Sequence, residues 1–221
     1  MRKETIPILF VLFMASTLAV SLVAIRWVYS GRPVFLFLLW NLSLAWLPLI
    51  LAMTAGALRR FPLLAILAGV AWLLFLPNAP YLLTDLLHLG RYDGAPFWYD
   101  MLTLLVFALT GLLLGFVSLE MMHGLVHERL GRITGWLFAL AALALSSVGV
   151  YIGRFLRWNS WDALLRPADI LADLWTLLHQ PWVHRQAYIF SFGLATILVC
   201  VYLVLILIPR SQLGEIRSSS N

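Results

Sequence analysis

A polar segment interrupts the otherwise apolar chain at residues 77–89, which read PNAPYLLTDLLHL. Within it, Asp85 and His88 are three residues apart, so a helix would place both side chains on one face. A carboxylate beside an imidazole can accept and release protons, which is the chemistry of general acid–base catalysis. Ionisable residues at a membrane are also candidates for function. The sequence therefore predicts Asp85 and His88 as the catalytic, proton-handling groups of a site.

Two prolines in the same segment predict a break in a helix. Pro77 and Pro80 donate no backbone hydrogen bond, and each disfavours helix in the residue before it. We therefore expect one helix to end at about Leu76 and the next to start at Tyr81. The side chain of Asn78 can bond the freed backbone groups. The predicted ligand-binding residues of this segment are Asn78, Tyr81 and Thr84. The alternative is an interfacial turn whose polar groups satisfy only the chain itself.

A second polar segment, YIGRFLRWNSWD at residues 151–162, follows a later apolar run. Arginine presents a fork of donors that suits a carboxylate or a phosphate. Arg154 would share a helix face with Arg157 and Trp158 if the helix continued through them. The alternative for each arginine is a snorkelling anchor at the end of a span. The predicted ligand-binding residues here are Arg154, Arg157, Trp158, Asn159 and Asp162. Asp85 is then either the internal partner of an arginine or a second contact to the same ligand.

The composition places both segments in a membrane protein. Of the 221 residues, 62% are hydrophobic and 11% charged, with a mean hydropathy of +0.93. Soluble domains carry about a quarter charged residues. The net charge of +5 suits basic flanks against anionic headgroups. No nucleic-acid partner is expected, because no basic patch with interleaved aromatic residues lies outside the apolar runs. Cys200 is the one cysteine, which excludes an intrachain disulfide.

The apolar runs predict an all-α fold, a bundle of six transmembrane helices, since a span needs about 20 apolar residues. The expected spans are Ile6–Ile25, Val34–Leu58, Phe61–Leu76, Met101–Met122, Ile133–Ile152 and Tyr188–Ile208. Residues 61–89 are too many for one straight span and too few for two, so the third helix is expected to be broken. We predict one integral membrane domain over residues 1–210 and a short polar tail over residues 211–221.

The two polar segments are expected on the same side of the membrane, because an even number of crossings separates the ends of the third and fifth spans. Six spans place both termini on the opposite side. Lys and Arg number eight on the terminal side and seven on the other. The positive-inside rule thus gives a small preference for a multi-pass cell-membrane protein with cytoplasmic termini. Asn41, in the near half of the second span, can reach towards the polar segments.

An amphipathic stripe and two glycine pairs also carry predictions about structure. Residues 163–187 place Asp169, Asp173, Thr176 and Gln180 on one stripe opposite apolar residues, which predicts an interfacial amphipathic helix that packs at the surface or covers a cavity. The glycine pairs Gly111/Gly115 and Gly149/Gly153 have the spacing that lets helices approach closely.

A metal site is the weakest of the chemical possibilities. Glu120, His123 and His127 are spaced i, i+3 and i+7 at the end of the fourth span, but three ligands from one helix rarely suffice and the HExxH pattern is broken. We expect an ordinary polar helix end there and no metal. The chain has no GxSxG, Walker loop, GxGxxG or CxxC motif. The sequence therefore indicates no particular cofactor, and it leaves open whether the protein is an enzyme.

The two polar segments together resemble those of a family of bacterial membrane proteins grouped as domain of unknown function 1361. The matching residues are PNAPY at 77–81, TDL at 84–86 and HL at 88–89, then GRF at 153–155 and RWNSWD at 157–162. The likeness covers roughly residues 34–208. It implies a fold and two marked segments, and it supplies no activity, cofactor or catalytic residue.

Three functions are compatible with these residues. The first is a polar site at one membrane face, formed by the two segments, that binds or processes an anionic or lipid-linked ligand. The second is a small permease with a binding site at the helix break, which would need a homo-oligomer because no repeat is visible. The third is a scaffold or assembly protein in which the polar groups pair only with each other. The lipid bilayer is a partner in all three.

Overall fold

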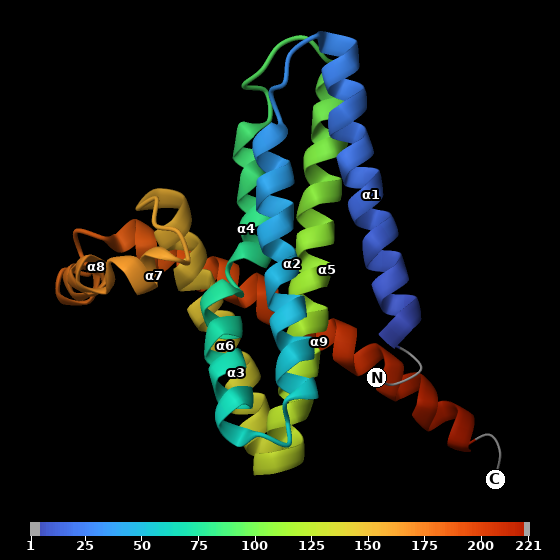
Figure 1. Ribbon diagram of the computed structural model, residues 1–221, viewed down its shortest axis with the longest axis vertical. Helices are drawn as coiled ribbons and strands as arrows, with labels where there is room; N and C mark the ends of the chain where they lie inside the picture. The colour runs from blue at the N-terminus through green and yellow to red at the C-terminus, as the bar shows by residue number, and fades with distance from the viewer. Residues whose placement is uncertain (1–4, 219–221) are drawn as a thin grey trace.

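The chain folds into a helical bundle without strands in the part that the computed structural model describes, residues 5–218 (Figure 1). Side chains are described for residues 5–206. The long helices are α1 (Thr5–Ser30), α2 (Leu36–Ala57), α5 (Phe97–Leu130), α6 (Arg132–Phe155) and α9 (Arg185–Ser218). The shorter elements are α3 (Pro62–Phe75), α4 (Asn78–Thr84), the 3₁₀ helix η1 (Asp85–His88), α7 (Asp162–Leu165) and α8 (Pro167–His179).

Six helical stretches are long and apolar enough to cross a membrane, which confirms the all-α, six-span prediction. The third stretch runs from Pro62 to His88 and includes α3, α4 and η1. Each predicted span coincides with one of these stretches and differs from it only at the ends. α9 continues as helix to Ser218, through most of the residues assigned to a polar tail. The division into a domain and a tail remains a prediction.

The third span is broken as expected, although the second helix starts earlier than the prolines suggested. α3 ends at Phe75 and α4 begins at Asn78, three residues before the predicted start at Tyr81. Pro80 therefore lies in the first turn of α4. A helix tolerates proline there, because the backbone N–H groups of the first turn have no partner within the helix. The helix therefore breaks near Pro77, and Pro80 itself belongs to the second helix, α4.

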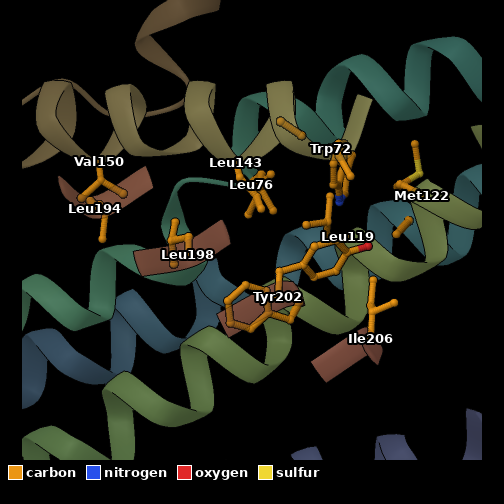
Figure 2. Packing of buried hydrophobic residues seen from close by; sticks show 14 of the residues in the cluster. Trp72, Leu76, Leu119, Met122, Leu143, Val150, Leu194, Leu198, Tyr202 and Ile206 are labelled. Carbon is orange, nitrogen blue, oxygen red and sulfur yellow. The ribbon is translucent and has the colours of Figure 1, made fainter. Parts of the chain in front are cut away.

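α5 is the central helix of the bundle. In its most apolar window 61% of the residues are buried, against 39% or fewer in every other span. One buried cluster lies between α2, α3, α5, α6 and α9, and Figure 2 shows Trp72, Leu119 and Tyr202 within it. A second cluster joins α1, α2, α4 and α5. α2 and α5 contribute to both clusters, and α5 is the more deeply buried of the two.

The predicted glycine pairs bring α4 close to both α5 and α6. A Cβ atom at Gly111 of α5 would lie 2.5 Å from the backbone oxygen of Ala79, and one at Gly115 would lie 2.9 Å from the Cβ of Ala79. A Cβ atom at Gly149 of α6 would lie 2.9 Å from the Cβ of Pro77. Real Cβ contacts are longer than these, so only glycine permits this packing. The short helix α4 is held between two long ones.

The expected amphipathic helix is α8, which with α7 forms an arm beside the bundle (Figure 1). Leu177 is buried against Tyr151 and Ala187 and attaches the arm to α6 and α9. Leu171, Trp175 and Leu178 are exposed on the other side of α8. An exposed apolar side of this kind suits the membrane interface. Asp173 of the predicted acidic stripe points towards the second polar segment, because it accepts a hydrogen bond from the indole Nε1 of Trp158 at 2.7 Å.

Candidate functional site

The side chain of Asn78 bonds the chain on both sides of the break in the third span. Its side-chain Nδ2 donates to the backbone oxygen of Phe75 at 2.9 Å, a carbonyl at the end of α3. The same nitrogen donates to Oγ of Ser160 at 2.9 Å. Asn78 thus bonds the freed backbone, as its position predicted, and also links the first polar segment to the second across 82 residues of sequence.

An ion pair between Asp85 and Arg154 lies beside the break. Asp85 has no exposed surface, and its Oδ1 accepts from Nη1 of Arg154 at 3.1 Å. Its Oδ2 accepts from the side-chain amide of Asn41 at 2.9 Å. The other guanidinium nitrogen, Nη2, donates to the backbone oxygen of Thr84 at 3.0 Å. Both carboxylate oxygens are therefore satisfied, as a buried charge requires.

His88 and Tyr81 complete the surroundings of Arg154. Nη2 of Arg154 lies 3.1 Å from Nδ1 of His88, and Nη1 lies 3.4 Å from the hydroxyl oxygen of Tyr81. Nδ1 of His88 also lies 3.2 Å from the backbone oxygen of Asp85, so this ring nitrogen stands between a donor and an acceptor. The hydroxyl of Thr84 is turned inward and donates to the backbone oxygen of Tyr81 at 2.6 Å.

The second polar segment does not continue α6 as a helix. α6 ends at Phe155, and Arg157 has a φ of +63°, outside the helical range. The expected common face of Arg154, Arg157 and Trp158 is therefore wrong. The backbone turns between them, which leaves Arg157 exposed while Trp158 lies partly buried. Asp162 begins α7, and its Oδ2 accepts from the backbone N–H of Asn159 at 2.7 Å.

A polar pocket lies between α2 and α6, with the helix break as its floor. Its hydrogen-bonding residues are Asn41, Asn78, Tyr81, Asn159 and Ser160. Trp40 and Trp158 provide aromatic walls, and Gly149 and Gly153 leave the α6 side free of side chains. The pocket offers about 100 Å³ of space to water-sized molecules. Both polar segments and the second span thus contribute to one cavity.

The predicted residues occupy two layers of this site. Asn78, Tyr81, Trp158 and Asn159 line the pocket. Asp85, His88, Thr84 and Arg154 form the ion-pair layer next to it and contact the lining through Asn41 and Tyr81. Asp162 lies behind Asn159, and Arg157 is outside the lining. The catalytic role of Asp85 and His88 remains a prediction.

Sequence reasoning did not place Trp40 in the site. Trp40 is 59% exposed on α2, and its ring meets that of Trp161 at 6.3 Å in an edge contact. Its neighbour Asn41 could not have indicated it, because consecutive residues of a helix point about 100° apart. Ser160, within the second segment, also lines the pocket although it was not singled out.

A second buried ion pair was also missed. Arg26 and Asp100 are 1% and 4% exposed and join through two hydrogen bonds of 2.6 and 2.9 Å. The expected spans ended at Ile25 and began at Met101, which put both residues just outside the membrane helices. α1 and α5 instead extend past them, because each charge neutralises the other inside the bundle.

The residues considered for a metal are used differently. Nδ1 of His123 lies 2.8 Å from the hydroxyl oxygen of Tyr202, and that hydroxyl donates to Oε2 of Glu120 at 2.9 Å. Among the described residues no group of three His, Cys, Asp or Glu side chains is arranged to hold a metal ion. Tyr202 thereby ties the end of α5 to α9 through a polar contact.

The comparisons with known proteins agree with the resemblance of the two segments. A family model described as protein of unknown function (DUF1361) matches residues 40–201. Neither the comparison with curated proteins nor that with solved structures gave a match. The matched range begins at Trp40 and includes every residue that lines the pocket. Because the match covers well over half of the chain, this protein belongs to the DUF1361 family.

Proposed function

We propose that this membrane protein binds the polar headgroup of a lipid-linked ligand in the pocket between α2 and α6. The observation that carries the proposal is the pocket itself, whose lining comes from both polar segments and from α2. A cavity with a few convergent polar groups and aromatic walls is the usual form of a small-ligand site. A scaffold in which the polar groups pair only with each other requires no open space between the two segments.

The position of the pocket supports a lipid-linked ligand. Trp40 forms one of its walls and is 59% exposed on α2, a helix apolar enough to span the membrane. The outer face of such a helix is covered by lipid. A ligand with an apolar chain can therefore keep that chain in the bilayer and place its headgroup beside Trp40. A free anion gains less here, because the guanidinium of Arg154 already pairs with Asp85.

The ion pair supports binding more directly than it supports catalysis. Asp85 is fully buried with both oxygens hydrogen-bonded, and neither it nor His88 lines the pocket. An acid or base must come within hydrogen-bond distance of the reacting group. Asp85 and Arg154 instead orient Asn41 and Tyr81, which do line the cavity. We assign them a positioning role.

A pocket-filling variant tests this function. Leu44 lines the cavity on α2, so Leu44→Trp should fill it. Ile50→Trp on the same helix is the matched control, since Ile50 is 51% exposed and outside the pocket. We expect native mass spectrometry of protein purified from its own membranes to show a bound lipid-linked species. That species should be lost from Leu44→Trp and kept by Ile50→Trp. Equal lipid retention by the two variants would refute the proposal.

The internal pairing of charges also favours a second candidate, a scaffold. Asp85, Arg154, Asn41 and His88 satisfy one another without any ligand. A scaffold of this kind predicts that filling the pocket leaves both the bound lipids and the cellular phenotype unchanged. The comparison of Leu44→Trp with Ile50→Trp therefore separates the two functions.

A further inference from the structure

We propose that the headgroup taken by this pocket is uncharged and rich in hydroxyl groups, as in a glycosyl lipid. This inference rests on the proposed function and adds the chemical class of the ligand. It is carried by the chemistry of the lining and by the charges around it.

The lining offers hydrogen bonds without charge. Within the described side chains, the polar ones that line the pocket are three asparagines, a tyrosine and a serine, and no Asp, Glu, Lys, Arg or His is among them. Amides and hydroxyls can both donate and accept. A ligand hydroxyl likewise does both, so each can match an amide or hydroxyl of the wall. A phosphate or carboxylate only accepts, and it would leave the acceptor groups of the wall unpaired.

The neighbouring arginine is committed to the protein. Nη1 of Arg154 donates to Asp85 and Tyr81, and Nη2 donates to the Thr84 backbone and contacts His88. An anionic headgroup would have to compete with Asp85 for this guanidinium. Displacing Asp85 would leave a buried carboxylate without its counter-charge, which is strongly unfavourable. Arg157, the other arginine of the segment, is exposed and outside the lining.

Two carboxylates stand directly behind the pocket wall. Asp162 accepts from both the backbone N–H and the side-chain amide of Asn159, at 2.7 and 3.2 Å. Asp173 accepts from the indole Nε1 of Trp158 at 2.7 Å. Like charges repel over the few ångströms that separate these groups from the cavity. One cation, Arg166, also lies at this wall, with its guanidinium 4.9 Å from the centroid of the Trp158 ring, and it is paired with Asp169. The wall therefore has no excess of positive charge to attract an anion.

The aromatic walls and the size of the pocket are compatible with a sugar headgroup. Trp40 and Trp158 present apolar ring surfaces, against which the C–H face of a sugar can pack while its hydroxyls meet the amides. The cavity offers about 100 Å³ of space to water-sized molecules, several times the minimum of about 10–15 Å³ that one water needs, so it admits a small headgroup.

The test compares lipids that share their acyl chains and differ only in the headgroup. The full-length protein is placed in phosphatidylcholine nanodiscs with monoglucosyl diacylglycerol, phosphatidic acid or diacylglycerol, and lipid retention is measured by native mass spectrometry. We expect the glucosyl lipid to be retained about tenfold or more over diacylglycerol, as a few added hydrogen bonds allow. Leu44→Trp should abolish this preference and Ile50→Trp should keep it.

Each other outcome has a separate meaning. If phosphatidic acid is retained in a way that Leu44→Trp abolishes, and the glucosyl lipid is not, the pocket binds a lipid headgroup but the inference is wrong. If no lipid distinguishes Leu44→Trp from Ile50→Trp, the proposed function fails with it. Competition by methyl β-glucoside as strong as by the glucosyl lipid would support the headgroup class and reject the lipid chain. Thermal unfolding verifies folding, and Leu44→Phe replaces Leu44→Trp if the latter lowers the Tm.

Discussion

Two arginine–carboxylate pairs determine where charge is tolerated among the apolar side chains. Asp85 pairs with Arg154 next to the pocket, and Asp100 pairs with Arg26 between α1 and α5. Removing one member of a buried pair leaves the other charge uncompensated, at a cost of about 3–5 kcal/mol. Both carboxylates are buried, Arg154 is somewhat more exposed than Arg26, and the two pairs differ in what they adjoin. They therefore provide matched substitutions, one near the site and one away from it.

We expect Asp85→Asn and Asp100→Asn each to lower the free energy of unfolding by about 3 kcal/mol, because each leaves an arginine without its counter-charge. Only Asp85→Asn should also reduce the retention of the bound lipid, because Asn41 loses the carboxylate that orients it. Denaturant unfolding in detergent measures the first effect and native mass spectrometry the second. Equal loss of lipid from both variants would show that the effect is global instability and not positioning.

At the scale of elements, the site depends on how closely α4 packs between α5 and α6. Gly111 leaves room for the backbone oxygen of Ala79 and Gly115 for its Cβ, while Gly149 leaves room for the ring of Pro77 on the other side. This packing fixes the position of Asn78 and Tyr81 along the bundle axis relative to the second polar segment. A break in a spanning helix exposes backbone groups that must be satisfied by protein or water. The close neighbours of α4 provide that protection.

Gly111→Ala should therefore destabilise the protein by about 1–3 kcal/mol, the usual cost of overpacking, since the new methyl meets the Ala79 carbonyl at 2.5 Å. Gly124→Ala on the same helix is the control, because no atom lies within 4 Å of a Cβ there. The control should be neutral or slightly stabilising, as alanine favours helix over glycine. Thermal unfolding of the two variants measures the difference, and equal Tm values would contradict the close packing of α4.

At the scale of the whole molecule, α2 and α5 join the two buried clusters and the pocket forms where the second, third and fifth spans converge. Large apolar side chains remain exposed along most helices, as lipid-facing surfaces require. The arm of α7 and α8 lies beside the pocket, and Trp158 and Asp173 connect the two. The site is therefore assembled from elements distant in sequence.

A disulfide cross-link tests this assembly in membranes. In a Cys200→Ser background, Asn78→Cys and Ser160→Cys should cross-link efficiently on oxidation, because their side chains are hydrogen-bonded at 2.9 Å. The control pair is Asn78→Cys with Gly124→Cys. Gly124 lies nine residues beyond Gly115, or about 13 Å along α5, which is out of disulfide range. Similar cross-linking of both pairs would mean that the two polar segments are not specifically joined.

The sequence by itself determined the spans and the helix break, and it predicted that the two polar segments lie on the same side. A span is recognised from the hydropathy of consecutive residues, and a proline breaks the helix in which it lies. The side of each loop follows from whether the number of spans before it is odd or even. These properties need no tertiary contact. The pairing of Asp85 with Arg154 was one of two alternatives that the residues left open.

The tertiary structure alone decided which side chains line the pocket. The turn after Phe155 sent Arg157 outward and Trp158 inward, and the rotation of α2 brought Trp40 to the cavity. The partnership of Arg26 with Asp100 likewise depends on the packing of α1 against α5. Rotation and depth of a helix are set by its contacts with distant helices, and glycines such as Gly149 permit those contacts only when the partner is in place. The residues around such a glycine in the sequence do not show which distant helix will pack against it.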